Sequence, residues 1–498
     1  MVADEAPKPM TADRSESPAE QSSAAIETHI SRLWFTPDRV YKMLKPVSFG
    51  FLDLTDRHSR LAATTRELEL NRRFAPDVYL GLADVVEAGD LVERMIVLRR
   101  LPEARRLVAL VGDPDFDELL RSVARRVAAL HAEADPVLDA PMARRDRVQR
   151  NWTNNFAAIE PHVGPVIGAE EFARVRQLTL GYLAGRKTLF DERIAKGFVV
   201  DGHGDLTAED IFCLDDGPRL LDCLAFDDDL RVSDVLADIG FLIMDVQRLT
   251  DASTALRLMS AYQEFSDEHH PASLAHHYVA YRAHVRAKVA CLRFAQGDAP
   301  SADLARTYHR LTLDHLERAR VRLILVGGGA GVGKTTIASA LADRFGYVRL
   351  STDEIRHDVT GIPRDEHRFV EPGTDIYAPE VVDATYDELT RETALLVARG
   401  HSVVLDASWS RDDHRTTIRE VAERFDSDVV EIECVLDPGV ARERIERRRA
   451  NSSDPSDATR DVVDYLAARR APWPTASTLS TADAVQAVIE RAAALVER

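Results

Sequence analysis

A glycine-rich segment that ends in lysine and threonine is the part of this sequence best suited to chemistry. It follows the apolar run 323–326 and precedes the helical pattern 336–341. In this order the glycines let backbone N–H groups surround phosphate oxygens, a lysine reaches the terminal phosphates and a hydroxyl ligates magnesium. We therefore predict a site for ATP and Mg²⁺, in which Lys334 also serves catalysis and Thr335 ligates the metal. The predicted nucleotide-binding residues are Gly328, Gly329, Ala330, Gly331, Val332, Gly333, Lys334, Thr335 and Thr336.

Two aspartates follow the next apolar runs of the chain. Asp353 comes just after residue 352, with Arg356 one helical turn further on, and Asp406 ends the run 402–405. A carboxylate at the carboxyl end of a parallel strand is well placed to hold magnesium, which we predict for Asp406. Asp353 and Arg356 lie on the same helical face if the helix starts at Asp353. Resemblance to small-molecule P-loop kinases implies that Asp353 contacts an acceptor hydroxyl and that Arg356 binds the substrate through an acidic group or phosphate. The alternative for Asp353 is a helix cap.

A basic run lies between residues 441 and 449. Arginines on a closing segment neutralise charge on a transferred phosphoryl group and exclude water, so Arg442 and Arg449 are predicted to be catalytic. The alternative is a solvated helix, because Glu443 and Glu446 alternate with the arginines.

These positions resemble the gluconate-kinase, shikimate-kinase and zeta-toxin group of small P-loop kinases. The shared order is a P-loop, an aspartate after the second strand, an aspartate after a buried strand and an arginine-rich segment. Ser456-Asp457-Ala458 also matches a segment common in that group. The resemblance implies phosphoryl transfer to a small molecule.

A second group of acidic residues lies much earlier in the chain. Asp205 belongs to a His-Gly-Asp loop, Asp210 follows five residues later, and Asp222 ends a strand-like run. Three carboxylates gathered by a loop and a hairpin suit a magnesium site with a general base, because hard cations prefer oxygen ligands. The alternative is a set of acidic turn residues in an acidic protein.

This second segment resembles the catalytic loop of the aminoglycoside and choline phosphotransferase superfamily, whose fold is protein-kinase-like. The resemblance implies that Asp205 accepts the proton of the acceptor hydroxyl. By the same resemblance Asp210 and Asp222 would hold magnesium, and Asp234 would brace the loop.

The resemblance extends upstream, where it implies a strand lysine and a helical glutamate that bind nucleotide. Lys42 and Glu67 stand at these positions, and Lys45 is a rival for Lys42. The alternative is that Lys42 and Glu67 form an ordinary surface ion pair.

Three residues depart from the pattern of that superfamily. Thr207 and Asp210 stand where His and Asn are usual, and Ala225 stands where related two-domain proteins have Glu. Aspartate still ligates magnesium through oxygen, but its charge weakens nucleotide binding unless the metal compensates. The sequence leaves open whether the first site is active or is a regulatory nucleotide site.

The elements that must position these residues define the domain organisation. Residues 1–24 lack apolar periodicity and are predicted to be a disordered tail. Residues 25–320 are predicted to be the phosphotransferase-like domain, with an α+β small lobe (25–102) and a helical lobe (103–320). Residues 321–498 are predicted to be an α/β P-loop domain with a parallel sheet.

Composition argues against several classes of protein. No apolar run approaches the roughly 18 residues of a membrane span, and a net charge of −19 disfavours a nucleic-acid surface. The four cysteines lack paired spacing and no signal-peptide order is present, which favours the cytoplasm.

Two clusters of basic and aromatic side chains have ordinary and functional interpretations. The histidine doublets 269–270 and 276–277 are predicted to lie on the surface. A helical series suits either an anionic small molecule or helix packing, and its members are Tyr281, Arg282, Arg286 and Lys288.

Both resemblances together match a bacterial family of fused phosphotransferase and P-loop ATPase proteins, which includes an uncharacterised actinobacterial member linked to dormancy. We predict an ATP- and Mg²⁺-dependent phosphotransferase with two nucleotide sites, acting on a hydroxyl of a sugar, amino sugar or aminoglycoside-like compound. A second interpretation is a nucleotide-dependent stress or regulatory protein. A third is a zeta-toxin-like kinase for a nucleotide sugar, restrained by the first domain. The oligomeric state is not specified by the sequence.

Overall fold

The computed structural model of the 498-residue chain describes residues 25–28, 30–49, 52–363, 374, 376, 378–450 and 470–497. The predicted tail at 1–24 and the segment Ser456–Ala458 lie outside these residues. Contacts within the chain define two compact units. Unit 1 comprises Met1–Val123 and Thr207–Arg231, and unit 2 comprises Ala124–Leu206 and Val232–Arg498. The domain boundary near residue 320 stays a prediction.

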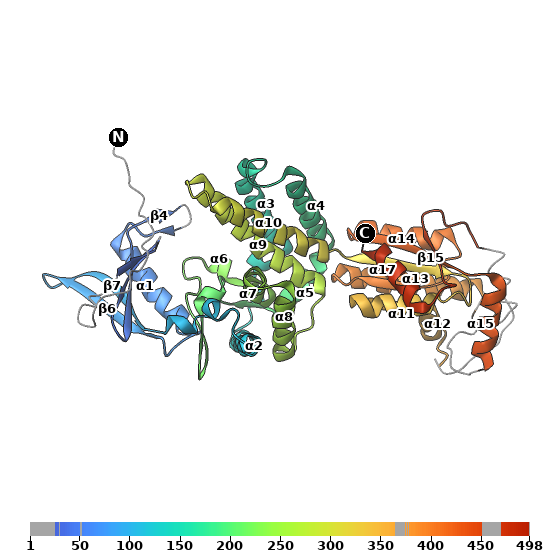
Figure 1. Cartoon of the computed structure of the whole chain (residues 1–498), viewed down its shortest axis with the longest axis horizontal. Coiled ribbons are helices and arrows are strands. Elements are labelled where there is room, and N and C mark those ends of the chain that lie inside the picture. Colours follow the sequence, from blue (N-terminus) through green and yellow to red (C-terminus); the bar gives the residue numbers. More distant parts are fainter. Residues whose placement is uncertain are drawn as a thin grey trace. The chain divides into compact units, whose positions relative to one another are not determined.

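Unit 1 is built on an antiparallel five-stranded sheet with strand order β1-β2-β3-β7-β6. Helix α1 packs against β7, β6 and β3 of this sheet (Figure 1). Asp56 caps α1 by accepting a hydrogen bond from the backbone N–H of Ser59 at 2.9 Å, as expected for a helix N-terminus. The strands are β1 (Ala25–Glu27), β2 (Ser31–Phe35), β3 (Arg39–Leu44), β6 (Tyr79–Glu87) and β7 (Asp90–Arg99), and α1 spans Arg57–Asn71.

Smaller elements complete unit 1. The strands β9 and β10 form the hairpin that precedes Asp222. Phe212 of β9 joins the apolar core formed by α1 and the sheet, which fixes the hairpin in place. The remaining elements are β4 (Ser48–Phe49), β5 (Leu52–Asp53), η1 (Glu103–Arg105), η2 (Leu107–Leu110), η5 (Ala208–Asp210), β9 (Ile211–Leu214), β10 (Gly217–Leu220) and α6 (Asp228–Arg231).

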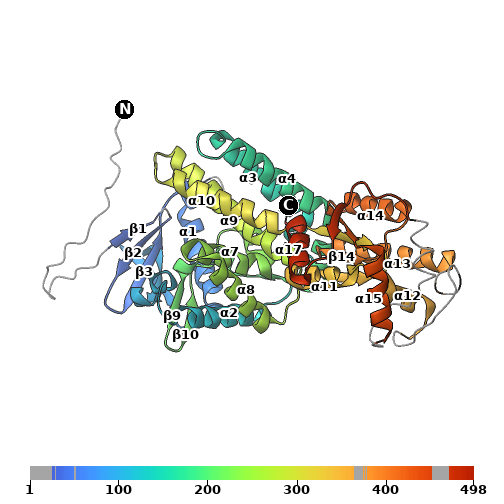
Figure 2. The same cartoon turned by 45° about the vertical axis from the view of Figure 1, so that its right-hand side comes forward.

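The first part of unit 2 is helical. Helices α9 and α10 pack against each other along their length, and α3 and α4 lie beside them (Figure 2). The short strands β8 and β11 pair antiparallel and carry the chain into and out of the segment assigned to unit 1. The elements are α2 (Phe116–Glu133), η3 (Pro141–Ala143), α3 (Arg145–Ile159), η4 (Glu160–His162), α4 (Ala169–Gly185), α5 (Lys187–Ala195), β8 (Val199–Asp201), β11 (Val232–Asp234), α7 (Val235–Leu249), α8 (Ala252–Ser266), α9 (Ala272–Ala295) and α10 (Ser301–Arg318).

One sequence prediction about these helices is wrong. His277 is fully buried rather than exposed, because α9 is covered by neighbouring helices. Its ring stacks on Tyr182 with centroids 4.5 Å apart, and its Nε2 lies 3.3 Å from the Trp152 Nε1 that donates to it. Burial lowers the pKa of His277 to about 3, so it is a neutral core residue. Its doublet partner His276 is half-buried, with its Nδ1 2.9 Å from His315 Nδ1.

The second part of unit 2 is a parallel sheet with strand order β13-β14-β12-β15-β16. Helices α11 and α17 pack against each other, and so do helices α13 and α14. All four helices also contact strands of this sheet. Strand β12 is central and almost wholly buried, which places the segment after it at the carboxyl edge of the sheet. The elements are β12 (Arg322–Gly328), α11 (Lys334–Phe345), β13 (Val348–Ser351), α12 (Thr352–Thr360), α13 (Pro379–Ala398), β14 (Val403–Asp406), α14 (Asp412–Arg424), β15 (Asp428–Val435), α15 (Pro438–Ala450), β16 (Ser477–Ser480) and α17 (Val485–Val496).

The predicted fold classes, α+β followed by α/β with a parallel sheet, are confirmed by this topology. Among the described helices none combines the length and apolarity needed to cross a membrane.

Candidate functional site

The glycine-rich segment forms the turn between β12 and α11. Gly328, Gly331 and Gly333 have φ angles of +140°, +77° and +93°, which residues other than glycine rarely adopt. Space is also short: a Cβ at Gly331 would lie 2.6 Å from the carbonyl oxygen of Ala441. These residues therefore form a tight loop whose backbone leads directly into the N-terminus of α11, the end of a helix that attracts phosphate.

The predicted magnesium ligands of this region lie next to each other. Asp406 is buried at the end of β14, and the Thr335 side chain hydrogen-bonds its carboxyl group. Burial raises the pKa of Asp406, and the positive charge of Lys334 opposes that rise. Hydroxyl and carboxylate oxygens fit Mg²⁺, which prefers oxygen ligands and keeps several from water or phosphate. Lys334 Nζ donates to the carbonyl of Gly329 at 2.9 Å.

Within the described part of the chain, no group of three or more His, Cys, Asp or Glu side chains is arranged to hold a metal ion. Thr335 and Asp406 would offer a cation one hydroxyl and one carboxylate, so nucleotide phosphates and water would have to complete its coordination.

The predicted substrate residues lie on α12, close to Asp406. Ser351 caps this helix and accepts from the Asp353 backbone N–H at 3.3 Å, so Asp353 is not the cap. The carboxylate of Asp353 instead accepts from Arg356 Nη1 at 2.8 Å. It also lies close enough to Asp406 for its negative charge to help raise the pKa of that carboxyl group.

Helix α15 carries the basic run. Ala441 and Ile445 of this helix lie against Gly331. Arg442 is exposed, and the side chain of Arg449 lies outside the described residues, so their catalytic roles stay predictions.

Sequence reasoning missed Arg444, whose Nη2 donates to the carbonyl of Thr481 at 3.1 Å. Its Nη1 also lies 3.8 Å from the position of a Cβ on Gly333. Thr481 in turn donates its hydroxyl to the carbonyl of Val332 at 2.7 Å and so braces the glycine-rich loop. In the sequence Arg444 is one of several arginines in a row, and no local signal distinguishes it.

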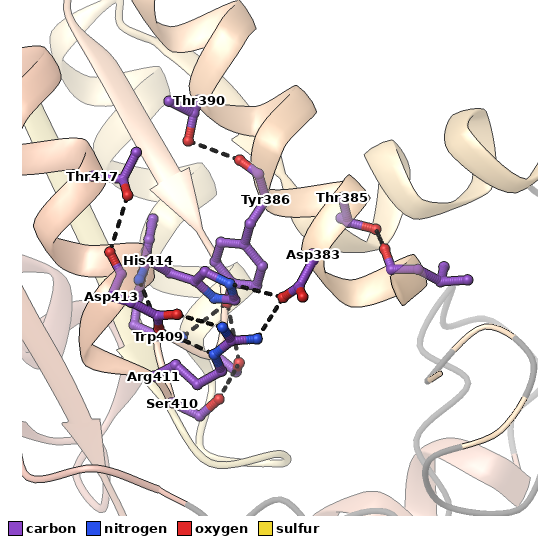
Figure 3. Close-up of polar contacts among 12 residues, drawn as sticks. Asp383, Thr385, Tyr386, Thr390, Trp409, Ser410, Arg411, Asp413, His414 and Thr417 are labelled. Carbon is purple, nitrogen blue, oxygen red and sulfur yellow. Dashed lines mark hydrogen bonds and ion pairs between the residues drawn. The ribbon is translucent and has the colours of Figure 1, made fainter. Parts of the chain in front are cut away.

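The loop after Asp406 is held by a second cluster that the sequence did not indicate (Figure 3). The hydroxyl of Tyr386 accepts from the Trp409 backbone N–H and lies near Ser408 Oγ, both at 3.3 Å. Trp409 has a φ of +49°, unusual for a bulky residue, so its backbone conformation needs this support. His414 stacks on Tyr386 with ring centroids 3.8 Å apart and faces Asp383 at 3.4 Å.

In unit 1 the predicted nucleotide-binding pair is formed. Lys42 Nζ lies 2.8 Å from Glu67 and 2.5 Å from Asp222. With side chains only 13% and 10% exposed, Lys42 and Glu67 are not a surface pair. Burial acts to lower the pKa of Lys42, but Asp222 and Glu67 raise it well above its usual value. The rival Lys45 donates to the carbonyl of Thr28 instead.

The backbone at Asp222 is held in a rare conformation, with a φ of +60°. The Tyr79 hydroxyl accepts from the Asp222 N–H at 3.0 Å, and Asn71 Oδ1 accepts from the Cys223 N–H at 2.8 Å. Nearby in the chain, Asp210 accepts a hydrogen bond from the Thr207 hydroxyl at 2.6 Å.

In unit 2 the His-Gly-Asp loop is braced from α7. The Asp238 carboxylate accepts from the backbone N–H groups of His203 and Gly204 at 2.5 and 2.7 Å. Although burial acts to raise it, hydrogen bonding and charge from His131 keep the pKa of Asp238 below its usual value. The sequence resemblance assigned this role to Asp234.

Asp234 has a different role, because it caps α7 and lies 2.7 Å from Arg193. Asp205 accepts from Arg286 Nη2 at 3.1 Å. The carboxylate implied to be the general base therefore stands beside a guanidinium group.

The AAA domain family matches residues 323–473. The Mycobacterium tuberculosis protein named uncharacterized protein Rv2004c is 36% identical over 463 residues, which cover 92% of this chain and 92% of that protein. Uncharacterized protein Mb2027c of Mycobacterium bovis matches with the same identity and coverage.

Similar solved structures cover single regions. A choline/ethanolamine kinase family protein from Mesorhizobium loti, 12% identical, covers 60% of this chain and 94% of its own, with a TM-score of 0.35. A Janibacter sugar kinase, 18% identical, covers 36% of this chain and 95% of its own, with a TM-score of 0.28. Because both scores are below 0.5, the fold rests on the strand order and contacts described above. These place an antiparallel sheet and helices before a parallel sheet in the chain, as predicted.

Proposed function

The chain belongs to one family with the mycobacterial proteins Rv2004c and Mb2027c, and on this premise we propose that it is an ATP- and Mg²⁺-dependent phosphotransferase. The γ-phosphate would pass to a hydroxyl of a small polar molecule such as a sugar, amino sugar or aminoglycoside-like compound. Neither a nucleic acid nor a membrane is proposed as a partner.

The observation that carries this proposal is the gathering of Lys334, Thr335, Asp406 and Asp353 around the carboxyl edge of one parallel sheet. Lys334 and the loop N–H groups would hold the triphosphate, and Asp353 would orient the acceptor hydroxyl and take its proton. The hydroxyl oxygen then bonds to the γ-phosphorus as the bond to the leaving ADP oxygen breaks. Thr335 and Asp406 would hold Mg²⁺, which neutralises phosphate charge when bound.

Unit 1 supports a second nucleotide site in this proposal. Lys42, positioned by Glu67, would bind phosphate, and Asp210 and Asp222 would bind Mg²⁺. Asp205 in unit 2 would accept a proton from an acceptor hydroxyl. The oxygen ligands fit a hard cation, and buried Glu67 fits the role of fixing a phosphate-binding lysine.

Transfer of labelled γ-phosphate from ATP into a pooled metabolite extract tests the proposal. Wild type, Lys334→Ala and Asp205→Ala are compared, each checked for an unchanged thermal midpoint. Lys187→Ala is a matched control, because this exposed lysine pairs with Asp191 one turn along α5. We expect Lys334→Ala to lose most of the labelled product and Lys187→Ala to form as much of it as wild type. Absence of any labelled product from wild type would refute the proposal.

A second candidate function is a nucleotide-dependent regulatory protein. It is favoured by the hydrogen bonds that Asp222 and Asp210 already make to Lys42 and Thr207 within unit 1, because the metal must compete with them. This function predicts slow ATP hydrolysis without an acceptor and nucleotide-dependent binding of a partner protein. Acceptor-dependent label transfer that is lost with Asp205→Ala would exclude it for the first site.

A further inference from the structure

A basic side chain of α9, Arg286, faces Asp205. Arg286 Nη2 donates to Asp205 Oδ1 at 3.1 Å, and both side chains are partly exposed, at 28% and 44%. The Arg286 guanidinium lies over the ring of Phe241, 4.8 Å from its centroid, which fixes the orientation of the group. Asp205 therefore shares its solvent-facing surface with a positioned guanidinium that keeps further N–H groups for a ligand.

A second guanidinium lies one helical turn before the first. Arg282 is 8% exposed and donates to the carbonyl of Ala237 at 2.9 Å. Its guanidinium also lies over the Phe241 ring, 4.9 Å from the centroid. Neither the ion pairs nor the hydrogen bonds of the described residues give Arg282 a carboxylate partner. Arg282 therefore adds a second positive charge on the same face of α9 as Arg286, against the same Phe241 ring.

This arrangement discriminates between acceptors by charge. A protonated amino group placed against Arg286 would meet a like charge at short range, which costs binding energy in a partly desolvated site. A carboxylate or phosphate there would instead form charge-assisted and bidentate hydrogen bonds with the guanidinium. The geometry favours an anionic acceptor over a cationic one.

We propose that the acceptor handled at Asp205 is a small hydroxyl compound with an anionic group, carboxylate or phosphate, that binds Arg286. This inference rests on the proposed phosphotransferase function and names its substrate class at the first site. The acceptor oxygen bonds to the γ-phosphorus of ATP, its proton passes to Asp205, and ADP leaves with the electrons of the broken bond. Arg286 selects and orients the acceptor and takes no proton.

A different role for the same guanidinium would be to stabilise the transferred phosphoryl group itself. In that case Arg286 would act on every acceptor alike, and its loss would lower kcat without changing the KM of the acceptor. The two roles are separable by kinetics.

The test uses the full-length chain carrying Lys334→Ala, which silences the P-loop site. A metabolite extract is separated on anion- and cation-exchange resins, and each fraction is assayed for labelled product from γ-labelled ATP. We expect the acceptor in the fraction retained by the anion exchanger. Phosphatase treatment of that fraction before the assay distinguishes the two sources: loss of the acceptor identifies a phosphate, and survival identifies a carboxylate.

Substitutions then assign the charge to Arg286. Arg286→Gln is expected to raise the KM of the acceptor at least tenfold and to leave the KM of ATP within twofold. Arg286→Lys is expected to have a smaller effect, and it serves if the glutamine variant does not fold. The matched control is Arg293→Gln, which removes the same charge from an exposed position two turns further along α9.

Three results would overturn the inference. The acceptor could come from the unretained or cation-exchange fractions, or Arg286→Gln could lower kcat alone. Label transfer by wild type but not by Lys334→Ala would also overturn it and leave the phosphotransferase proposal standing. Failure of transfer by wild type would remove both.

Discussion

Alanine substitution at two glycines of the same loop should destabilise the protein to very different extents. Gly331 has a φ of +77°, and a Cβ there would lie 2.6 Å from the Ala441 carbonyl oxygen and 2.9 Å from Ile445. The left-handed conformation costs alanine about 1–2 kcal/mol, and forcing a methyl group into packed atoms costs about 1–3 kcal/mol more. At Gly329 the nearest atom to a Cβ is Val332 Cγ1 at 3.8 Å, an ordinary contact.

Gly331→Ala should therefore destabilise the nucleotide-free protein by about 2–5 kcal/mol, and Gly329→Ala by less than about 0.5 kcal/mol. At roughly 2–4 °C per kcal/mol, the first change lowers the midpoint of the transition that includes the P-loop by about 4–20 °C. Differential scanning calorimetry without nucleotide measures both variants. Equal midpoints for the two would refute the reasoning, because the loop would not be packed against α15 as described.

Three further substitutions test the site. Asp406→Asn should raise the thermal midpoint of the apo protein and abolish transfer. Burial raises the pKa of the Asp406 carboxyl, so the folded state favours the protonated form. The folded protein therefore loses stability as the pH rises and this group ionises, and asparagine removes that loss. Thermal shift at pH 7 and pH 5 checks this, with the gain smaller at pH 5. Tyr386→Phe leaves the Trp409 N–H without its acceptor, so kcat should fall about tenfold with nucleotide affinity unchanged; a stopped assay with separate nucleotide titration decides. Asp238→Asn keeps one acceptor for the two N–H groups of residues 203–204, which should cost about 1–3 kcal/mol in urea unfolding; an unchanged midpoint would contradict it.

The sequence was sufficient to predict the parts of the site that are formed by residues close together in the chain. The P-loop needs glycines at fixed offsets between a strand and a helix, so the fold of residues 328–335 follows from the residues themselves. Asp406 was also predictable, because an apolar run ending in aspartate reads as a buried strand with a carboxylate at its end. The contact between Thr335 and Asp406 then follows from the parallel pairing of β12 with β14.

Residues that act through distant partners were not predictable. Asp234 and Asp238 lie four positions apart and both are buried acids near the start of α7. Only the packed structure shows that Asp238 reaches the His203 backbone and that Asp234 turns to Arg193. The role of Thr481 was not predictable either, because its contact with Val332 spans 149 positions in the sequence.

Two of the three departures from the phosphotransferase pattern contact each other. Thr207 donates to Asp210 at 2.6 Å, so the hydroxyl satisfies part of the charge that the aspartate adds.

That extra carboxylate would separate the two proposed nucleotide sites by their need for metal. The proposed site in unit 1 would offer a triphosphate the ammonium of Lys42, which is already shared by Glu67 and Asp222, together with the carboxylate of Asp210. Without a divalent cation the charges repel the nucleotide. The P-loop instead presents Lys334 and backbone N–H groups, which attract phosphate without metal. We expect calorimetric titration of wild type to show one ATP bound in EDTA and two with Mg²⁺, and Lys334→Ala to bind one only with Mg²⁺. Two sites in EDTA would show that Asp210 does not carry the charge assigned to it here.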